Sequence, residues 1–344
     1  MIPDDDPAAD WTAGGPYLCA PGVYRIPLPL PQDGLRAVNV YAVPDGDGWT
    51  LIDSGWALAE SRDLLAAALD RLGAGLGDVR RFLVTHIHRD HYTQAVALRR
   101  EFGAHVALGR GEEVGLAEIH TSGRDPFAVH RTRLLRAGAG ALAARIEQGR
   151  TADQGDMSLY EKPDEWIEDG AEIAVGDRHV LTAVETPGHT RGHLVFADDA
   201  AGLLFAGDHV LPRITPSIGF EPKPPQSPLA DFLTSLQLVR SRKDALLLPA
   251  HGPVGMRVHE RVDALLEHHG DRLDDTLAAV REGRSTAHAV AEALPWTRHR
   301  RRLAEMDTFN AMLAVLETQA HLDVLAERGA VTITLQSGVA HYTS

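Results

Sequence analysis

Residues 85–91 read THIHRDH and directly follow the apolar run RFLV. A loop that leaves a buried strand can aim alternate side chains at one point, so His86 and His88 can meet at one cation. Asp90 and His91 then face a neighbouring position. Neutral imidazole nitrogens and carboxylate oxygens suit Zn²⁺ and other borderline divalent metals. The stretch therefore predicts a metal site at the end of a strand.

Three further candidate ligands follow predicted strands elsewhere in the chain. A hydrolytic metal needs ligands from distant segments and an open position for water. The candidates and the strands before them are His189 after 179–186, Asp208 after 202–207 and His251 after 245–250. Neighbouring glycines allow tight turns and a close backbone approach; they are Gly188, Gly207 and Gly252. Four strand ends that offer His or Asp indicate one shared site.

The first 255 residues favour a mixed α/β fold. Segments rich in β-branched residues predict further strands at 22–28, 36–43, 48–53, 82–85, 105–108, 171–175 and 194–197. Apolar residues at helical spacing predict helices at 58–72, 92–102 and 229–242. Residues 110–165 interrupt this alternation with helical stretches, such as 131–146, and no clear strand. We interpret them as a helical insertion.

The character of the chain changes after His251. Helical patterns are predicted at 257–269, 271–283, 285–294 and 303–328, followed by a hairpin at 330–342. Helices followed by a hairpin outline a winged helix. We therefore predict a catalytic domain at 1–255 and a winged-helix-like domain at 256–344.

Composition excludes several classes of protein. The chain has 344 residues, 44% of them apolar, and no apolar run long enough to span a membrane. One cysteine, Cys19, cannot form an intrachain disulfide framework. The formal net charge of −14 disfavours nucleic acid and anionic membranes as partners. The acidic N-terminus lacks the apolar region of a secretory signal, so we expect a cytoplasmic protein.

The motifs resemble those of the metallo-β-lactamase-fold hydrolase superfamily. The resemblance covers about residues 20–255 and rests on LIDSG (51–55), THIHRDH (85–91), TPGHTRGH (186–193), FAGD (205–208) and LPAHG (248–252). It implies an αββα sandwich with two divalent metal ions at one sheet edge, with zinc favoured and iron or manganese open.

The same resemblance implies a role for each candidate ligand. The first metal would be held by His86, His88 and His189, the second by Asp90, His91 and His251, with Asp208 between them. Asp53 matches the aspartate that supports the ligand loop from behind. His193 is interpreted as a further supporting or packing residue.

These assignments lead to a functional prediction. A hydroxide held between two metals would attack a small ester, thioester or lactone, with Asp90 and Asp208 as catalytic residues that orient it and shuttle a proton. The alternative within the superfamily is an endoribonuclease or phosphodiesterase. A redox enzyme is disfavoured because the chain lacks the acidic ligand substitution and the flavodoxin domain of flavodiiron relatives, and because it keeps a second ligand set that one-iron persulfide-oxidising relatives do not need. A non-catalytic regulator is disfavoured because all seven ligand positions are filled.

Other polar residues are assigned more peripheral places. Arg124, His130, Arg131 and His209 are candidate substrate contacts at the mouth of the site. Histidines in the predicted C-terminal helices or their flanks are expected at the surface; they are His268, His269, His288, His299 and His321. The C-terminal region resembles the winged-helix tail of β-lactamase-like hydrolases. We expect it to serve packing or a homodimer rather than DNA binding, and we expect a small-molecule substrate.

Overall fold

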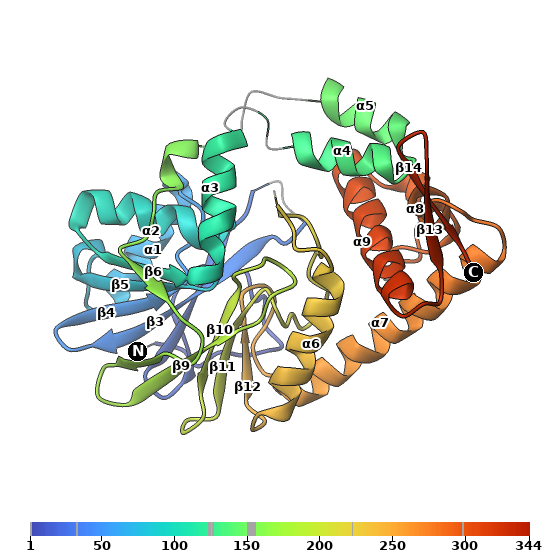
Figure 1. Ribbon diagram of the computed structural model, residues 1–344. Coiled ribbons are helices and arrows are strands. Elements are labelled where there is room, and N and C mark those ends of the chain that lie inside the picture. Colours follow the sequence, from blue (N-terminus) through green and yellow to red (C-terminus); the bar gives the residue numbers. More distant parts are fainter. Residues whose placement is uncertain are drawn as a thin grey trace.

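The computed structural model describes residues 2–31, 34–122, 125, 127–149, 156–221, 223–297 and 299–344. Within them, two β-sheets pack face to face and helices cover the outer face of each sheet (Figure 1). This arrangement confirms the predicted α/β fold class.

The first sheet has seven strands in chain order. They are β1 (Tyr17–Ala20), β2 (Val23–Pro29), β3 (Ala37–Asp45), β4 (Gly48–Ile52), β5 (Val79–Val84), β6 (His105–Gly109) and β7 (Glu165–Ile167). The first four pair as antiparallel neighbours, and β4 to β7 are parallel. Parallel strands need crossover connections, which here contain helices.

The second sheet has five strands in the spatial order β12, β11, β10, β9 and β8. Their bounds are β8 (Glu172–Val175), β9 (His179–Glu185), β10 (Leu194–Asp198), β11 (Leu203–Gly207) and β12 (Leu246–Pro249). Because β10 is antiparallel to both β9 and β11, and β12 is parallel to β11, the strands β9, β11 and β12 share one direction. Their carboxyl ends therefore lie at the same edge of the sheet.

Apolar side chains hold the layers together. Between the sheets, Tyr41 of β3 meets Phe205 of β11 with ring centroids 5.4 Å apart. The outer face of the first sheet is covered by α1 (Ala59–Arg71), α2 (Arg89–Phe102) and α3 (Glu113–Ser122). The outer face of the second sheet is covered by α6 (Pro228–Ser241). Four layers in the order α, β, β, α result.

The C-terminal region adds three helices and a hairpin. The elements are α7 (Val258–Arg281), α8 (Ala287–Ala293), α9 (Thr308–Glu327), β13 (Thr332–Gln336) and β14 (Val339–Thr343). The insertion contributes α4 (Ala128–Arg136) and α5 (Gly140–Gln148), which pack on α9. Short 3-10 turns lie at Leu76–Asp78, Arg110–Glu112, Met157–Leu159 and Leu303–Glu305.

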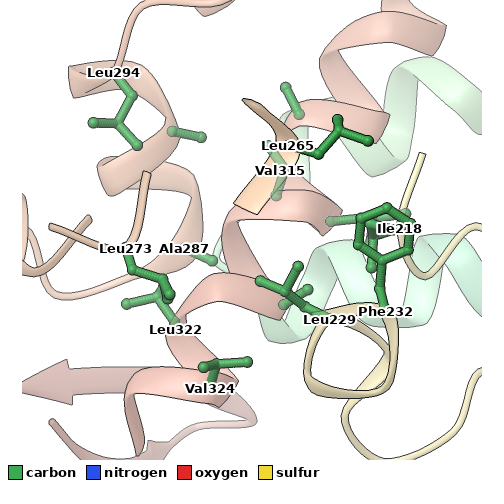
Figure 2. Packing of buried hydrophobic residues seen from close by; sticks show 14 of the residues in the cluster. Ile218, Leu229, Phe232, Leu265, Leu273, Ala287, Leu294, Val315, Leu322 and Val324 are labelled. Atoms are coloured by element: carbon green, nitrogen blue, oxygen red, sulfur yellow. The ribbon is translucent and has the colours of Figure 1, made fainter. Parts of the chain in front are cut away.

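One hydrophobic cluster joins the C-terminal region to the outer face of the second sheet. Figure 2 shows Leu229 and Phe232 of α6 near Leu265 of α7 and Val315 of α9. The cluster therefore crosses the predicted boundary near residue 255. The division into two domains and the winged-helix assignment stay predictions.

Several predicted boundaries were wrong. The segments 257–269 and 271–283 form the single helix α7, because Gly270 keeps a helical backbone at a cost of about 1 kcal/mol. Conversely, the stretch 131–146 is broken between α4 and α5, where Gly138 takes φ 80°. The short strands β1 and β7 were not predicted.

Two histidines predicted at the surface are buried. His269 of α7 and His321 of α9 are 0% and 1% exposed, and their rings meet with Nδ1 of His269 3.2 Å from Nε2 of His321. His268 and His299 are exposed as predicted, and His288 is half-buried. No helix in the described ranges is long and apolar enough to cross a membrane.

Candidate metal centre

The predicted ligands meet at one edge of the sandwich and form two groups. The first group has His86, His88, His189 and Asp208, each of which offers a ligand atom within 4.8 Å of the others. Nδ1 of His88 lies 3.0 Å from Nε2 of both His86 and His189. The loop after β5 supplies the first two residues, and the carboxyl ends of β9 and β11 supply the others. Because these strand ends share one edge, residues over a hundred positions apart converge.

The second group has Asp90, His91 and His251. Oδ2 of Asp90 lies 3.6 Å from Nε2 of His91 and 3.5 Å from Nε2 of His251. His251 follows β12, whereas Asp90 and His91 lie in the first turn of α2.

Asp208 lies between the two groups. Its Oδ2 is 3.4 Å from Nε2 of His189 in the first group. Its Oδ1 is 3.2 Å from Nε2 of His251 and 3.7 Å from Nε2 of His91 in the second. Each carboxylate oxygen thus faces a different set of imidazoles.

Hydrogen bonds on the outer side orient three of these imidazoles. In each, Nδ1 faces an acceptor: Asp53 Oδ2 at 2.8 Å from His91, the Ser217 carbonyl at 2.8 Å from His189, and the Ala37 carbonyl at 2.7 Å from His251. A proton held on Nδ1 leaves Nε2 as a free lone pair that points inward. Such imidazoles are oriented to bind a cation.

Asp53 supports the ligand loop from behind, where the motif resemblance assigns it. Its Oδ1 accepts hydrogen bonds from the Thr85 backbone N–H at 2.8 Å and the Thr85 hydroxyl at 2.9 Å. Its own backbone takes φ 60°, which is uncommon for a residue other than glycine. This carboxylate therefore ties the end of β4 to the end of β5 and to His91.

His193 holds the loop that carries Asp208. Its Nδ1 lies 2.9 Å from the Thr186 hydroxyl, and its Nε2 accepts the Asp208 backbone N–H at 3.1 Å. A Cβ on Gly207 would lie 2.6 Å from Nε2 of His193, and Gly207 has φ 49°. Only glycine allows this approach without a shift, so His193 supports Asp208 rather than joining the ligand groups.

The charge and hydrogen bonding of the site fit divalent cations. Nε2 of His91, Nε2 of His251 and Oδ1 of Asp208 are buried and have no hydrogen-bond partner in the described part of the chain. Burial lowers the pKa of His91, but the carboxylates of Asp53, Asp90 and Asp208 outweigh burial and raise that pKa to about 10, so the metal-free imidazole holds a proton that a bound cation would replace. The buried carboxylates thus draw positive charge into the site. Nitrogen and oxygen ligands of this kind accept zinc, iron or manganese.

The predicted substrate contacts fall into different places. Arg124 lies outside the described residues. His130 is buried, and its Nε2 donates to the Phe220 carbonyl at 2.8 Å. Arg131 is engaged by Asp125 and by Glu147, whose Oε2 lies 2.9 Å from its Nε. The guanidinium is therefore already paired.

His209 packs against Phe232 of α6. Its ring lies 5.1 Å from that of Phe232 and is fully buried. Burial lowers its pKa to about 3, so the imidazole stays neutral. It does not belong to either ligand group.

Sequence reasoning missed Glu112. This fully buried carboxyl accepts a hydrogen bond from the hydroxyl of Thr190, the neighbour of His189, and the Ile87 backbone amide also donates toward it. A Cβ on Gly192 would lie 2.1 Å from the Glu112 nitrogen, so the two loops pack backbone to backbone. Glu112 thereby links both loops that carry the first group. Nothing in the sequence GRGEEVG distinguishes it from a surface glutamate.

Glu112→Gln is expected to flatten the pH dependence of unfolding between about pH 5 and 8. Burial, aided by the Glu221 carboxylate, raises the pKa of Glu112 to about 8 from an ordinary 4.5. The folded protein then holds a proton that the unfolded chain releases. Wild-type stability therefore falls as pH rises toward the folded pKa, by at most about 1.4 kcal/mol per pH unit. Glutamine has no proton to lose.

Urea unfolding at several pH values measures this difference. Glu113→Gln is the matched control, because its side chain is 46% exposed and one residue away. Parallel stability curves for wild type and Glu112→Gln would contradict the prediction.

Comparisons with known proteins agree with this geometry. The profile of the metallo-beta-lactamase superfamily matches residues 33–251. The probable metallo-hydrolase YqjP of Bacillus subtilis is 24% identical over 329 residues, which cover 92% of this chain and 96% of that protein. The crystal structure of a beta-lactamase domain protein from Burkholderia ambifaria superposes with a TM-score of 0.81 at 27% identity, covering 99% of this chain and 97% of that one.

Two further relatives match over shorter stretches. The beta-lactamase-like protein 2 homolog of Caenorhabditis elegans is 34% identical over 117 residues, which are 34% of this chain and 37% of that protein. The atrochrysone carboxyl ACP thioesterase of Aspergillus fumigatus is 27% identical over 116 residues, which are 34% of this chain and 25% of that protein. The superfamily match covers more than half of the chain and includes all seven predicted ligands, so this protein belongs to the metallo-beta-lactamase superfamily.

Proposed function

We propose that this protein binds two divalent cations and hydrolyses a small ester, thioester or lactone. The observation that carries the proposal is the position of Asp208, whose two carboxylate oxygens face different groups of inward-pointing imidazoles. One group alone would suit a single cation. A carboxylate placed between two groups suits a pair of them.

The residues of the chain divide the chemical work. Bound divalent cations would polarise the acyl carbonyl and lower the pKa of water. Asp90 is the more accessible of the two catalytic candidates, with a side chain 12% exposed against 8% for Asp208. Burial raises the pKa of Asp90, but the nearby His91 and His251 outweigh burial, so the pKa lies below its ordinary value and the carboxylate is ionised. The Asp90 carboxylate would orient the attacking water and shuttle a proton to the leaving oxygen or sulfur.

A thioester or ester fits better than a nucleic acid. Part of the chain is similar to a fungal acyl-carrier-protein thioesterase. The formal net charge of −14 repels a polyanion, and that repulsion acts against RNA as a substrate.

Hydrolysis assays on the metal-loaded protein test this proposal. The panel contains a thioester, an ester, a lactone and single-stranded RNA, each with zinc, iron or manganese, and metal content is measured in parallel. We expect turnover of an acyl substrate with two ions per chain. Cleavage of RNA with no acyl hydrolysis would replace the proposal by the phosphodiesterase alternative.

A further inference from the structure

A group of aromatic rings extends from the candidate metal centre to the surface. The ring of Phe220 lies 6.2 Å from that of His88, centroid to centroid. On its other sides lie His130 at 4.8 Å and Phe309 at 5.4 Å. Phe127 lies 5.8 Å from His130. We call Phe127, His130, Phe220 and Phe309 the aromatic wall.

Three separate parts of the chain build the aromatic wall. Phe220 lies in the loop before α6, Phe127 and His130 belong to the insertion, and Phe309 lies in the first turn of α9. The same loop also holds the first ligand group, because the Ser217 carbonyl accepts the hydrogen bond from Nδ1 of His189. The wall is therefore continuous with the catalytic edge of the sandwich.

Hydrogen bonds fix the loop on both sides of Phe220. The Gly219 carbonyl accepts from Arg133, and the Phe220 carbonyl accepts from Nε2 of His130 at 2.8 Å. The Glu221 carboxylate, 1% exposed, accepts the Arg191 backbone N–H at 3.0 Å. Three consecutive residues are thus anchored, and the Phe220 ring is oriented before any substrate binds.

The aromatic wall offers apolar surface beside the candidate metal centre. His88 and Phe220 are half-buried, and Phe309 is 45% exposed although it is a large apolar side chain. Two described cations of α4 are already engaged: Arg131 by Asp125 and Glu147, and Arg133 by the Gly219 carbonyl. A partly exposed aromatic surface that adjoins a catalytic site indicates a binding site for an apolar group.

We propose that Phe220 and Phe309 bind an uncharged, apolar acyl group of the substrate while its carbonyl lies at the two ligand groups. This inference rests on the proposed acyl hydrolysis and names its substrate class. The ring contacts that support this inference run from His88 to Phe220 and from Phe220 to Phe309. Phe309, which follows the last ligand by more than fifty residues, thereby determines specificity at the candidate metal centre.

The test compares acetyl and octanoyl thioesters of N-acetylcysteamine with the metal-loaded full chain. Each methylene group that moves from water onto the aromatic rings raises the binding constant by up to about fourfold. We therefore expect the wild-type kcat/KM to be more than about tenfold higher for the octanoyl than for the acetyl thioester. Phe309→Ala and Phe220→Ala should each reduce the octanoyl-to-acetyl ratio by roughly tenfold. Phe220→Leu should retain part of that ratio. Leu335→Ala, a residue 60% exposed on β13, should leave both rates unchanged.

Two outcomes would overturn the inference. One is an equal kcat/KM for acetyl and octanoyl thioesters in the wild type, and the other is an unchanged ratio in both phenylalanine variants. Calorimetric binding of octanoate and acetate separates this inference from the proposed function. If no acyl substrate is hydrolysed, tighter octanoate binding that weakens in Phe309→Ala still supports the wall. Octanoate binding no tighter than acetate refutes it.

Discussion

Asp208→Ala is expected to lower the bound metal from two ions per chain to one or fewer and to reduce kcat/KM by more than about 100-fold. Loss of a partner that only supports a ligand already costs roughly 10- to 100-fold. Asp208 faces both groups, with its oxygens 3.4 Å from His189 and 3.2 Å from His251. The variant therefore removes a ligand from each site at once. Elemental analysis and thioester kinetics on the same preparation measure both effects.

Asp199→Ala provides the matched control for this variant. Asp199 lies beyond β10 with a side chain 59% exposed, and it pairs only at the surface with Arg242. Exposed pairs of this kind contribute about 0–1 kcal/mol, so metal content and kcat/KM should stay at wild-type values. Two bound ions and full activity in Asp208→Ala would contradict the dinuclear proposal.

Removal of the metal is expected to abolish hydrolysis and to lower the melting temperature. A ligand that binds only the folded state stabilises it by about 4 kcal/mol when it is present at a thousand times its Kd. Without cations, the buried Nε2 atoms of His91 and His251 and Oδ1 of Asp208 lack partners in the described structure. Dialysis against dipicolinate followed by calorimetry measures the loss. Addition of zinc should restore both the activity and the melting temperature.

The metal-removal prediction has a clear contrary outcome. A chelated protein that contains no zinc, iron or manganese, yet keeps its melting temperature and its rate, would show that these side chains serve another purpose. A Cys19→Ser variant tests whether the thiol binds metal. We expect it to bind and lose metal as the wild type does, because Cys19 belongs to neither ligand group.

The superfamily and its sandwich could be predicted because the decisive signals are local. The candidate ligands lie within a few residues of the carboxyl end of a strand or in the first turn of the helix that follows it. The direction of a strand fixes the sheet edge at which such residues lie. His189, Asp208 and His251 therefore lie at one sheet edge because β9, β11 and β12 run in the same direction. The acceptors behind His189 and His251 are the backbone carbonyls of Ser217 and Ala37. Because every residue has a backbone carbonyl, the sequence could not single these two out.

Features that depend on packing between distant helices could not be predicted. α9 packs against α4, α5, α6, α7 and α8, so it is buried on most of its circumference. A pattern that assumes one apolar face and one solvated face places His321 and its partner His269 at the surface, although both are buried. Glu112 was missed for the same reason: its importance arises from Thr190, a contact across 78 positions.

The hydrophobic core around α9 couples the C-terminal helices to the surface beside the candidate metal centre. Phe309 lies in the first turn of α9, which α4 to α8 surround, while Phe220 lies in the loop whose Ser217 carbonyl holds His189. Replacement of the C-terminal helices would therefore also change the aromatic wall, because Phe309 is part of it. Substitutions in α9 and in the insertion would alter the proposed acyl-binding surface and leave the histidine motifs unchanged.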